Sequence, residues 1–346
     1  MKIVRFFFRP AGVAIVTVLA FLSFTRAGQV GREPFEKRAA EIGLRYITDI
    51  PLPGGTLRFD YQSIDEANRR LYISHMGANI VTVFDLNSRT VTKNMSDIPG
   101  PTGILAVPEL NCVYISTSRA NEIYVFDSRS LKLTAKVPTG RFPDGIAFDP
   151  RERRVFVSDE FGKSVTVFDA MTNRVLKNIR MGGEVGNTHY DSLSGLVYST
   201  VQTADELVAI DPSTLRIVAR YRLPGCEGPH GFFIDTRDDY AFVTGEDNAA
   251  YVVFDLAKRR IIARGKVGAG PDVLAFDSES RDLYVASESG IVSAFQLDRG
   301  TVTEIGEVYF AAHAHSVSVD EETRLVFFPL QDIGGRPVLR VMEPFH

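Results

Sequence analysis

Residues 138–179 read PTGRFPDGIAFDPRERRVFVSDEFGKSVTVFDAMTNRVLKNI, and the pattern of this stretch recurs along most of the chain. It contains a short apolar strand with an aromatic residue at its second place, a polar turn, and a second strand that ends in an acid. A period of about 40 residues indicates a repeat architecture. The aromatic place recurs in steps of 42, 42, 42, 44, 42 and 43 residues, at Tyr72, Tyr114, Phe156, Tyr198, Phe242, Tyr284 and Phe327. The closing acid recurs at Asp85, Asp127, Asp169, Asp211 and Asp255, and the series continues at Gln296 and Glu343.

Each repeat contains short strands joined by a polar turn, a short loop and a Gly/Pro turn. Four short strands in about 40 residues are typical of a β-propeller blade. Seven copies therefore predict an all-β, seven-bladed β-propeller. The last unit, His315–His346, has only three strands, and residues 45–52 (RYITDIPL) offer a fourth at the other end of the chain. Pairing these two ends would close the ring without an unpaired sheet edge.

The repeats also resemble a known family. The segments Ser164–Ile179 and Pro138–Glu160 are similar to repeats of the YVTN-type, YncE-like seven-bladed propellers, and the resemblance covers about residues 45–346. It implies the fold but not the activity, because that superfamily includes binding proteins, lactonases, lyases and subunits of haem or quinone dehydrogenases. The chain departs from the repeat at Gly186–His189, which replaces a Pro-x-Gly-Ile turn, and in a longer loop at Gln331–Pro337.

The charge and cysteine content of the chain excludes several classes of protein. The 346 residues carry 39 Lys and Arg against 43 Asp and Glu, a formal charge of -4. Without a basic run we expect no binding to nucleic acid, including the single-stranded DNA binding reported for one branch of the similar family. Two cysteines exclude a disulfide scaffold, and no C-x-x-C-H motif for covalent haem occurs. GxSxG and HExxH motifs are also absent.

Residues 1–27 have the layout of a secretory signal peptide. Three positive charges in residues 1–10 precede the uncharged stretch Ala11–Phe24, and Thr25–Ala27 offers a cleavage site with small residues. We therefore expect a periplasmic or secreted protein. The alternative is an uncleaved anchor formed by residues 6–24, which would be the chain's single attachment to a membrane.

The remaining chain divides into two parts. Residues 28–44 are predicted to be a linker with a short helix from Glu33 to Ile42, and residues 45–346 form the propeller domain. We expect a monomer whose partner is a small molecule or an envelope protein.

The register of the repeat predicts which residues meet at one mouth of the channel. In each blade, the residue five places before the end of the innermost strand begins that strand at the channel. These residues are Asp60, Thr102, Asp144, Gly186, His230, Asp272 and His315. The neighbouring loops add a second polar layer, made of Met76, Ser118, Glu160, Gln202, Glu246, Glu288 and Gln331.

Imidazole and carboxylate groups gathered at one point are what a divalent metal ion requires. The predicted metal ligands are His230, Asp272, His315, Asp60 and Asp144, supported by Glu160, Glu246 and Glu288. A bound ion would polarise a carbonyl or activate water, which suits a metal-assisted lactonase or lyase with His230, His313 or His315 as acid or base. Arg58 and Arg141 are candidates to hold an anionic substrate.

Other interpretations of these residues stay open at this point. Asp144 and Asp272 stand in Pro-Asp turns, where a carboxylate often caps its own turn, and the glutamates are ordinary solvated charges in many loops. His75 and His189 are expected to be surface or packing residues. Cys226 is either an unpaired thiol at a tight turn or a partly exposed ligand or nucleophile. A non-catalytic interaction scaffold, and non-covalent haem bound by His230 or His315, complete the alternatives.

Overall fold

A computed structural model of the chain describes residues 34–345. The predicted signal peptide or anchor, residues 1–27, lies outside the described residues. Within residues 34–345, no helix is long and apolar enough to cross a membrane.

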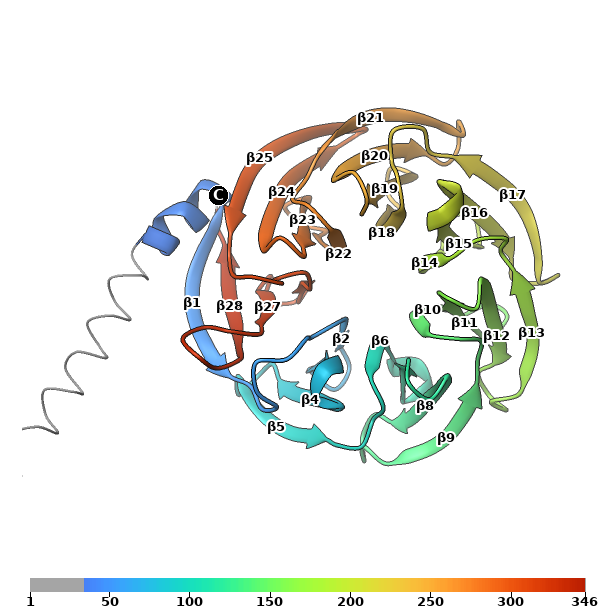
Figure 1. The fold of residues 1–346 in the computed structure, drawn as a ribbon, viewed down its shortest axis with the longest axis horizontal. Coiled ribbons are helices and arrows are strands. Elements are labelled where there is room, and N and C mark those ends of the chain that lie inside the picture. The colour runs from blue at the N-terminus through green and yellow to red at the C-terminus, as the bar shows by residue number, and fades with distance from the viewer. Residues whose placement is uncertain (1–33, 346) are drawn as a thin grey trace, which may run out of the picture.

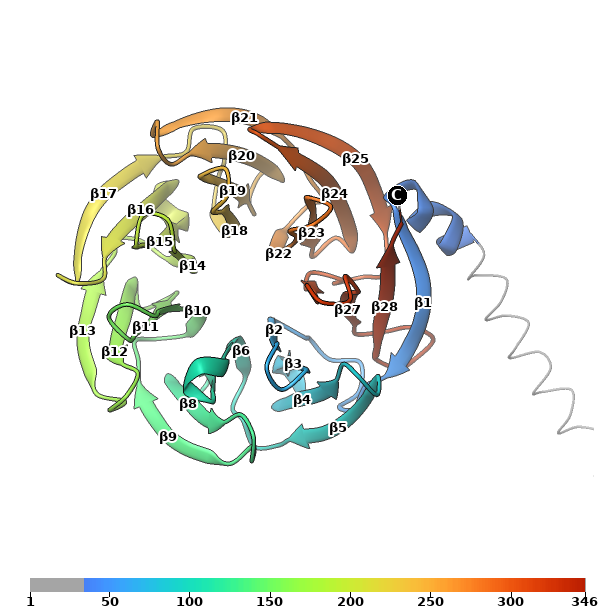
Figure 2. The same cartoon turned by 180° about the vertical axis from the view of Figure 1, so that it is seen from behind.

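Seven antiparallel four-stranded sheets surround a central channel, so the prediction of a seven-bladed β-propeller is confirmed (Figures 1 and 2). Each blade runs from an innermost strand at the channel to an outermost strand at the rim. The strands of blades 1 to 4 are β2 (Gln62–Asp65), β3 (Arg70–His75), β4 (Ile80–Asp85) and β5 (Thr90–Met95); β6 (Pro101–Val107), β7 (Cys112–Thr117), β8 (Glu122–Asp127) and β9 (Leu133–Pro138); β10 (Pro143–Asp149), β11 (Arg154–Asp159), β12 (Ser164–Asp169) and β13 (Val175–Arg180); and β14 (Val185–Asp191), β15 (Leu196–Val201), β16 (Glu206–Asp211) and β17 (Arg216–Arg222).

The strands of blades 5 to 7 are β18 (Pro229–Asp235), β19 (Tyr240–Gly245), β20 (Ala250–Asp255) and β21 (Arg260–Lys266); β22 (Pro271–Asp277), β23 (Asp282–Ser287), β24 (Ile291–Asp298) and β25 (Thr301–Tyr309); and β26 (Ser318–Val319), β27 (Val326–Leu330), β28 (Val338–Pro344) and β1 (Leu44–Pro51). Short 3₁₀ turns follow the second strands β3 and β15, at Met76–Ala78 and Gln202–Ala204, and the innermost strand β6, at Pro108–Leu110.

The ends of the chain pair to close the ring, as the sequence predicts. Strand β1 runs antiparallel to β28, from Leu44 opposite Pro344 to Pro51 opposite Val338. Arg340 donates two hydrogen bonds of 2.8 Å to the carboxylate of Asp49 across this seam. The closing strand β1, Leu44–Pro51, begins and ends one residue earlier than the predicted segment 45–52.

A helix at residues 34–41 lies outside the ring beside β1 and β25 (Figure 1). Phe35 packs edge-on against Phe310 at 5.1 Å between ring centroids, and the Arg340 guanidinium lies 4.2 Å from the Phe35 ring centroid. Ala39 is fully buried. The helix thus covers the outer side of the boundary between blades 6 and 7.

The core lies between neighbouring blades, and the repeated residues explain it. The seven aromatic residues of the repeat, from Tyr72 to Phe327, are all buried, with at most 3% of their surface exposed. The closing acids hold the turns: the Asp85 carboxylate accepts the backbone N–H of Ser88 at 2.7 Å, and Asp127 accepts that of Ser130 at 2.7 Å. Such Asx turns make the strand-end aspartate a structural part of blades 1 to 5.

Candidate functional site

The predicted ring residues lie at one mouth of the channel, at or just before the start of the innermost strands. Asp60, Asp144, His230, Asp272 and His315 are all buried, with at most 9% of their surface exposed. The structure therefore brings together the five residues that the sequence suggested as metal ligands. No backbone N–H within residues 34–345 donates to the side chains of Asp60, Asp144 or Asp272, so turn capping does not account for these carboxylates.

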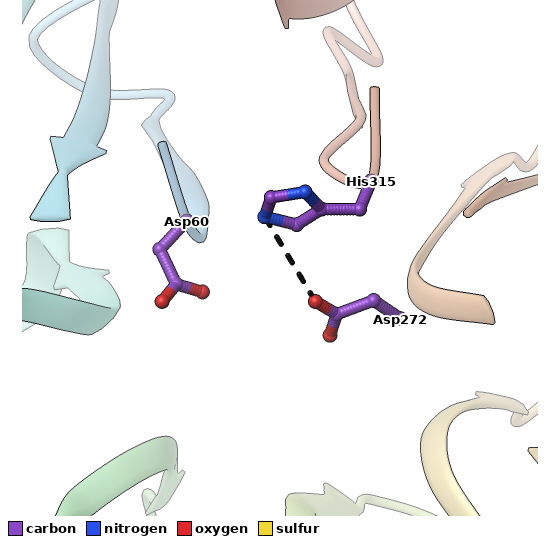
Figure 3. Close-up of side chains that lie close together, drawn as sticks. All are labelled: Asp60, Asp272 and His315. Atoms are coloured by element: carbon purple, nitrogen blue, oxygen red, sulfur yellow. Dashed lines mark ion pairs between the residues drawn. The ribbon is translucent and has the colours of Figure 1, made fainter. Parts of the chain in front are cut away.

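Three of these residues form the tightest group. One ligand atom each from Asp60, Asp272 and His315 lies within 4.8 Å of the others (Figure 3). His315 Nε2 is 3.9 Å from Asp272 Oδ2 and 3.2 Å from the carbonyl oxygen of Phe59. We call Asp60, Asp272 and His315 the three-residue cluster.

His230 lies beside the cluster and joins its two neighbouring aspartates. Its Nε2 atom is 3.3 Å from Asp272 Oδ1 and 3.9 Å from Asp144 Oδ2, and its Nδ1 atom is hydrogen bonded to the amide of Gln202. Burial acts to lower the pKa of His230, but the hydrogen bond and charge of Asp272, with the charge of Asp144, outweigh it and raise the pKa to about 10. The two aspartates therefore favour the protonated form of His230.

Asp60 is a buried acid of the site without a direct partner. Within residues 34–345 its carboxylate accepts no hydrogen bond and forms no ion pair within 4 Å. Burial and then repulsion from Asp144 raise the pKa of Asp60 well above its usual value. Burial raises the pKa of Asp144 to about 6, with His230 opposing and Asp272 adding to the shift. The pKa of Asp272 is lowered, because contacts with His230 outweigh its burial.

Glu288 belongs to the cluster's side of the mouth. It forms ion pairs with Arg58, with His313 Nδ1 at 2.9 Å and with His315 Nδ1 at 3.4 Å. Burial opposes ionisation, but these contacts hold the pKa of Glu288 well below its usual range. The side chain of His313 is 54% exposed and contacts Glu288 rather than the buried aspartates. His313 therefore lies at the rim, away from the three-residue cluster.

The other two predicted glutamates lie across the mouth. A cavity of about 230 Å³ is lined by Arg58, Asp60, Tyr61, Met76, Phe142, Asp144, Glu160, Phe161, His230, Glu246 and Asp272. The predicted second layer is thus divided, with Glu160 and Glu246 on this cavity and Glu288 among basic groups. Burial and then repulsion from Asp144 raise the pKa of Glu160 to about 7, against the opposing charge of His230.

The two arginines proposed as an anion clamp have other contacts. Arg58 is paired with Glu288 and lies 3.5 Å from Asp272 Oδ2. The Arg141 guanidinium lies 5.4 Å from the centre of the Phe161 ring. Arg58 is thus engaged by two acids, whereas Arg141 contacts an aromatic ring.

Sequence reasoning missed Tyr61, which is buried at the centre of the channel. Its hydroxyl is 3.2 Å from His230 Nε2 and 3.4 Å from Asp144 Oδ2, and it accepts a 3.1 Å hydrogen bond from Asn187 Nδ2. A signal did exist in the sequence. At the place after the ring residue, blades 2, 3 and 5 have glycine, whereas blades 1 and 4 have Tyr61 and Asn187.

The remaining candidates pack. His75 is fully buried and stacks on Phe59 at 4.0 Å between ring centroids, while His189 lies edge-on to Phe232 at 4.6 Å. Cys226 is fully buried, and burial raises the pKa of its thiol to about 12. Of the two alternatives, the unpaired thiol agrees with the structure and the partly exposed ligand or nucleophile does not, because the side chain lies in the core.

No protein-family model matches the sequence, and neither does any curated protein. Solved structures are similar in fold. A chain of hydrazine synthase from Kuenenia stuttgartiensis superposes with a TM-score of 0.71 at 14% identity, covering 84% of this chain and 96% of that one. The WD40 repeats of RRP9 give 0.73 at 11% identity, covering 88% and 98%. A chain of the mitotic checkpoint complex gives 0.73 at 8% identity, covering 87% and 92%. At these identities the likeness shows the propeller fold alone.

Proposed function

We propose that this propeller binds a divalent metal ion at its channel mouth through Asp60, Asp272 and His315. The observation that carries the proposal is the buried carboxylate of Asp60, which has no hydrogen bond or close ion pair and stands within ligand distance of a second carboxylate and an imidazole. A buried carboxylate without a partner is costly to ionise. A cation at this place would remove that cost and the repulsion between Asp60 and Asp144.

The three donor groups suit a metal ion that is intermediate between hard and soft. One imidazole nitrogen and two carboxylate oxygens are typical of Mn²⁺, Fe²⁺ or Zn²⁺ sites, whereas Ca²⁺ and Mg²⁺ prefer oxygen ligands throughout. Because Asp60 holds its proton more tightly than an ordinary carboxyl group, metal binding would release protons. His230 would stay outside the coordination shell as an imidazolium that positions Asp272.

We further propose that the protein is an exported member of the YVTN-type, YncE-like propellers. The repeat segments Ser164–Ile179 and Pro138–Glu160 support the family, and the charged and apolar layout of residues 1–27 supports export to the periplasm or secretion.

Isothermal titration of the EDTA-treated protein with Mn²⁺ and Zn²⁺ at pH 7.5 tests the metal proposal. We expect Asp60→Asn and His315→Gln to weaken binding at least about tenfold, whereas Asp191→Asn, in a turn-capping carboxylate at the other face, leaves it unchanged. A metal present at about 100 times its Kd should stabilise the wild type by about 2.7 kcal/mol. Equal binding by wild type and both site variants, or no binding at all, would overturn the proposal.

A metal-assisted lactonase or lyase is a second candidate, favoured by the cavity of about 230 Å³ that adjoins the cluster. The hydrogen-bonded pair of Tyr61 and His230 could move a proton beside a substrate held there. A screen of lactones and esters with the Mn²⁺-loaded protein tests this. Activity that depends on His230 and is absent in His230→Gln would support catalysis, and no turnover of any substrate would count against it.

A further inference from the structure

The side of the mouth formed by blades 3 and 5 combines acids with aromatic rings. Glu160 follows β11, Glu246 follows β19, and Phe142 and Phe161 lie on the adjoining loops of blade 3. Within residues 34–345, neither glutamate side chain makes a hydrogen bond or an ion pair. These four residues line the same cavity as Asp60, which is only 5% exposed and likewise has no hydrogen-bond partner.

Phe142 occupies a backbone position that blades 2, 5 and 6 give to glycine and that blade 7 gives to His313, also at a φ angle of +58°. Its φ angle is +58°, and the corresponding residues Gly100, Gly228 and Gly270 have φ angles of +59°, +60° and +63°. A bulky side chain in the left-handed region is strained, and such positions concentrate at ligand sites. The Phe142 backbone is fixed there by a 2.8 Å hydrogen bond from its N–H to Asn121 Oδ1 and a 2.9 Å bond to its carbonyl from Glu160 N–H. This fixed backbone conformation holds the Phe142 ring at the mouth of the channel.

The rings form a platform that already accepts one cation. Phe142 and Phe161 lie 4.8 Å apart at 49°, and 38% of Phe161 is exposed. The guanidinium of Arg141 lies 5.4 Å from the centre of the Phe161 ring. The face of an aromatic ring attracts cations through its quadrupole. Phe142 and Phe161 can therefore also bind the apolar body or the charged group of a cationic ligand.

The acidic residues that line the cavity favour a positively charged ligand. Five of its eleven lining residues are acidic, and the cations among them, Arg58 and His230, are each in contact with an acid. An anion would meet net repulsion here, whereas a cation would meet carboxylates without partners. At about 230 Å³ the cavity is smaller than the range of about 300–1,000 Å³ typical of drug-sized ligands. The ligand is therefore a small molecule.

We propose that the mouth cavity binds a small organic cation, a primary or methylated amine with an apolar body, whose ammonium group is held by Glu160 and Glu246 and whose body packs on Phe142 and Phe161. This site uses the side of the cavity opposite the three-residue cluster. It does not rest on the proposed metal, and both ligands could be bound together.

Benzylamine, benzyl alcohol and benzoate are matched probes, because they share one ring and differ in charge. Isothermal titration of the full, EDTA-treated protein at pH 8 should show benzylamine binding at least about tenfold more tightly than benzyl alcohol, and no binding of benzoate. The double variant Glu160→Gln/Glu246→Gln should lose at least about tenfold in benzylamine affinity, and Phe161→Leu should also weaken it. Glu279→Gln, which changes an exposed carboxylate at the other face, serves as the control.

The outcomes separate this proposal from the metal site. Loss of benzylamine binding in the double variant with Mn²⁺ binding retained would support a distinct cation site. Equal binding of benzylamine and benzoate, an unchanged affinity in the double variant, or no benzylamine binding up to about 10 mM would overturn the proposal. Benzylamine binding that is lost in Asp60→Asn but retained in the double variant would likewise overturn it, because the amine would then occupy the three-residue cluster.

Discussion

Tyr61 of blade 1 and Asn187 of blade 4 meet across the channel through a 3.1 Å hydrogen bond from Asn187 Nδ2 to Tyr61 Oη. The same hydroxyl also lies next to His230 in blade 5 and Asp144 in blade 3. Tyr61 lines both the mouth cavity and a second cavity of about 330 Å³ further along the channel. One phenol therefore divides the channel and links four blades to the candidate site.

Tyr61→Phe should destabilise the protein. The substitution keeps the ring but leaves the Asn187 amide without its buried partner and removes one contact of His230, at a cost of about 1–2 kcal/mol in the free energy of unfolding. Urea denaturation would measure the loss. Tyr309→Phe, in an exposed ring, is the matched control and should change stability by less than about 0.5 kcal/mol. Equal stability of Tyr61→Phe and the wild type would contradict a structural role for the hydroxyl.

The sequence was sufficient to predict the fold and the ring because both depend on a repeat of nearly constant length. A residue at a fixed phase of the repeat, such as His230 or Asp272, must lie at the same level of the channel in every blade. The closing strand could be predicted for a similar reason: the last repeat, His315–His346, has only three strands, and residues 45–52 have the pattern of the missing fourth strand.

The contacts within the site could not be predicted in this way. The phase of the repeat places Glu160, Glu246 and Glu288 at equivalent positions, but it does not say that Arg58 pairs with Glu288 alone among them. Such choices depend on side-chain torsions and on the non-repeated loops. Tyr61 was missed because it stands one place beyond the ring, where most blades have a residue without a polar side chain.

Asp60→Asn should make the metal-free protein more stable while abolishing its response to metal. The amide removes a buried charge that repels Asp144, so we expect the free energy of unfolding in EDTA to rise by about 1–2 kcal/mol at pH 8. The stabilisation by Mn²⁺ seen in the wild type should disappear. Urea denaturation with EDTA and with Mn²⁺ gives both numbers. A less stable metal-free variant would show that Asp60 is not an uncompensated charge.

The raised pKa of His230 predicts that stability falls at alkaline pH. Because its folded-state pKa of about 10 exceeds the unfolded value of about 6.5, the protonated imidazole stabilises the fold fully below about pH 6.5. This contribution is lost as the pH rises through about 10. Between pH 7 and pH 10 the wild type should lose at least about 1.4 kcal/mol more than His230→Gln, the free energy that corresponds to one pKa unit.

The measurement is the free energy of unfolding in urea at several pH values. His313→Gln, which changes the half-exposed rim histidine, should follow the wild-type curve over the same range. Parallel curves for wild type and His230→Gln would mean that His230 is neutral in the fold and that its contacts with Asp272 and Asp144 are not ionic.

The seam of the ring should depend on Arg340. This side chain is 6% exposed, donates two hydrogen bonds to Asp49 and lies over the Phe35 ring. Arg340→Ala leaves Asp49 without its counter-ion and removes packing from the helix at 34–41, so we expect a loss of about 3 kcal/mol in the free energy of unfolding. Arg45→Ala breaks an exposed pair with Glu343 on the same two strands and should cost at most about 1 kcal/mol. Similar losses in both variants would show that the buried Asp49–Arg340 pair contributes no more to the free energy of unfolding than the exposed pair.

Phe142→Gly should separate the backbone strain at the mouth from the contribution of the ring. Glycine removes the cost of a left-handed conformation, about 1–2 kcal/mol, but it also removes the contact with Phe161, worth about 0.5–1.5 kcal/mol. The two effects nearly cancel, so the free energy of unfolding should stay within about 1 kcal/mol of the wild type. Phe142→Leu keeps the strained backbone without the ring, and it should be less stable than Phe142→Gly by about 1 kcal/mol.

Urea denaturation of the two variants, with benzylamine titration of each, tests this separation. Both should bind benzylamine more weakly than the wild type, because neither keeps the aromatic face beside Glu160. If Phe142→Gly were the less stable of the pair by more than about 1 kcal/mol, the ring would be held by packing that outweighs the strain. Phe142 would then be a structural residue of blade 3, and its left-handed backbone would no longer support a ligand at the mouth.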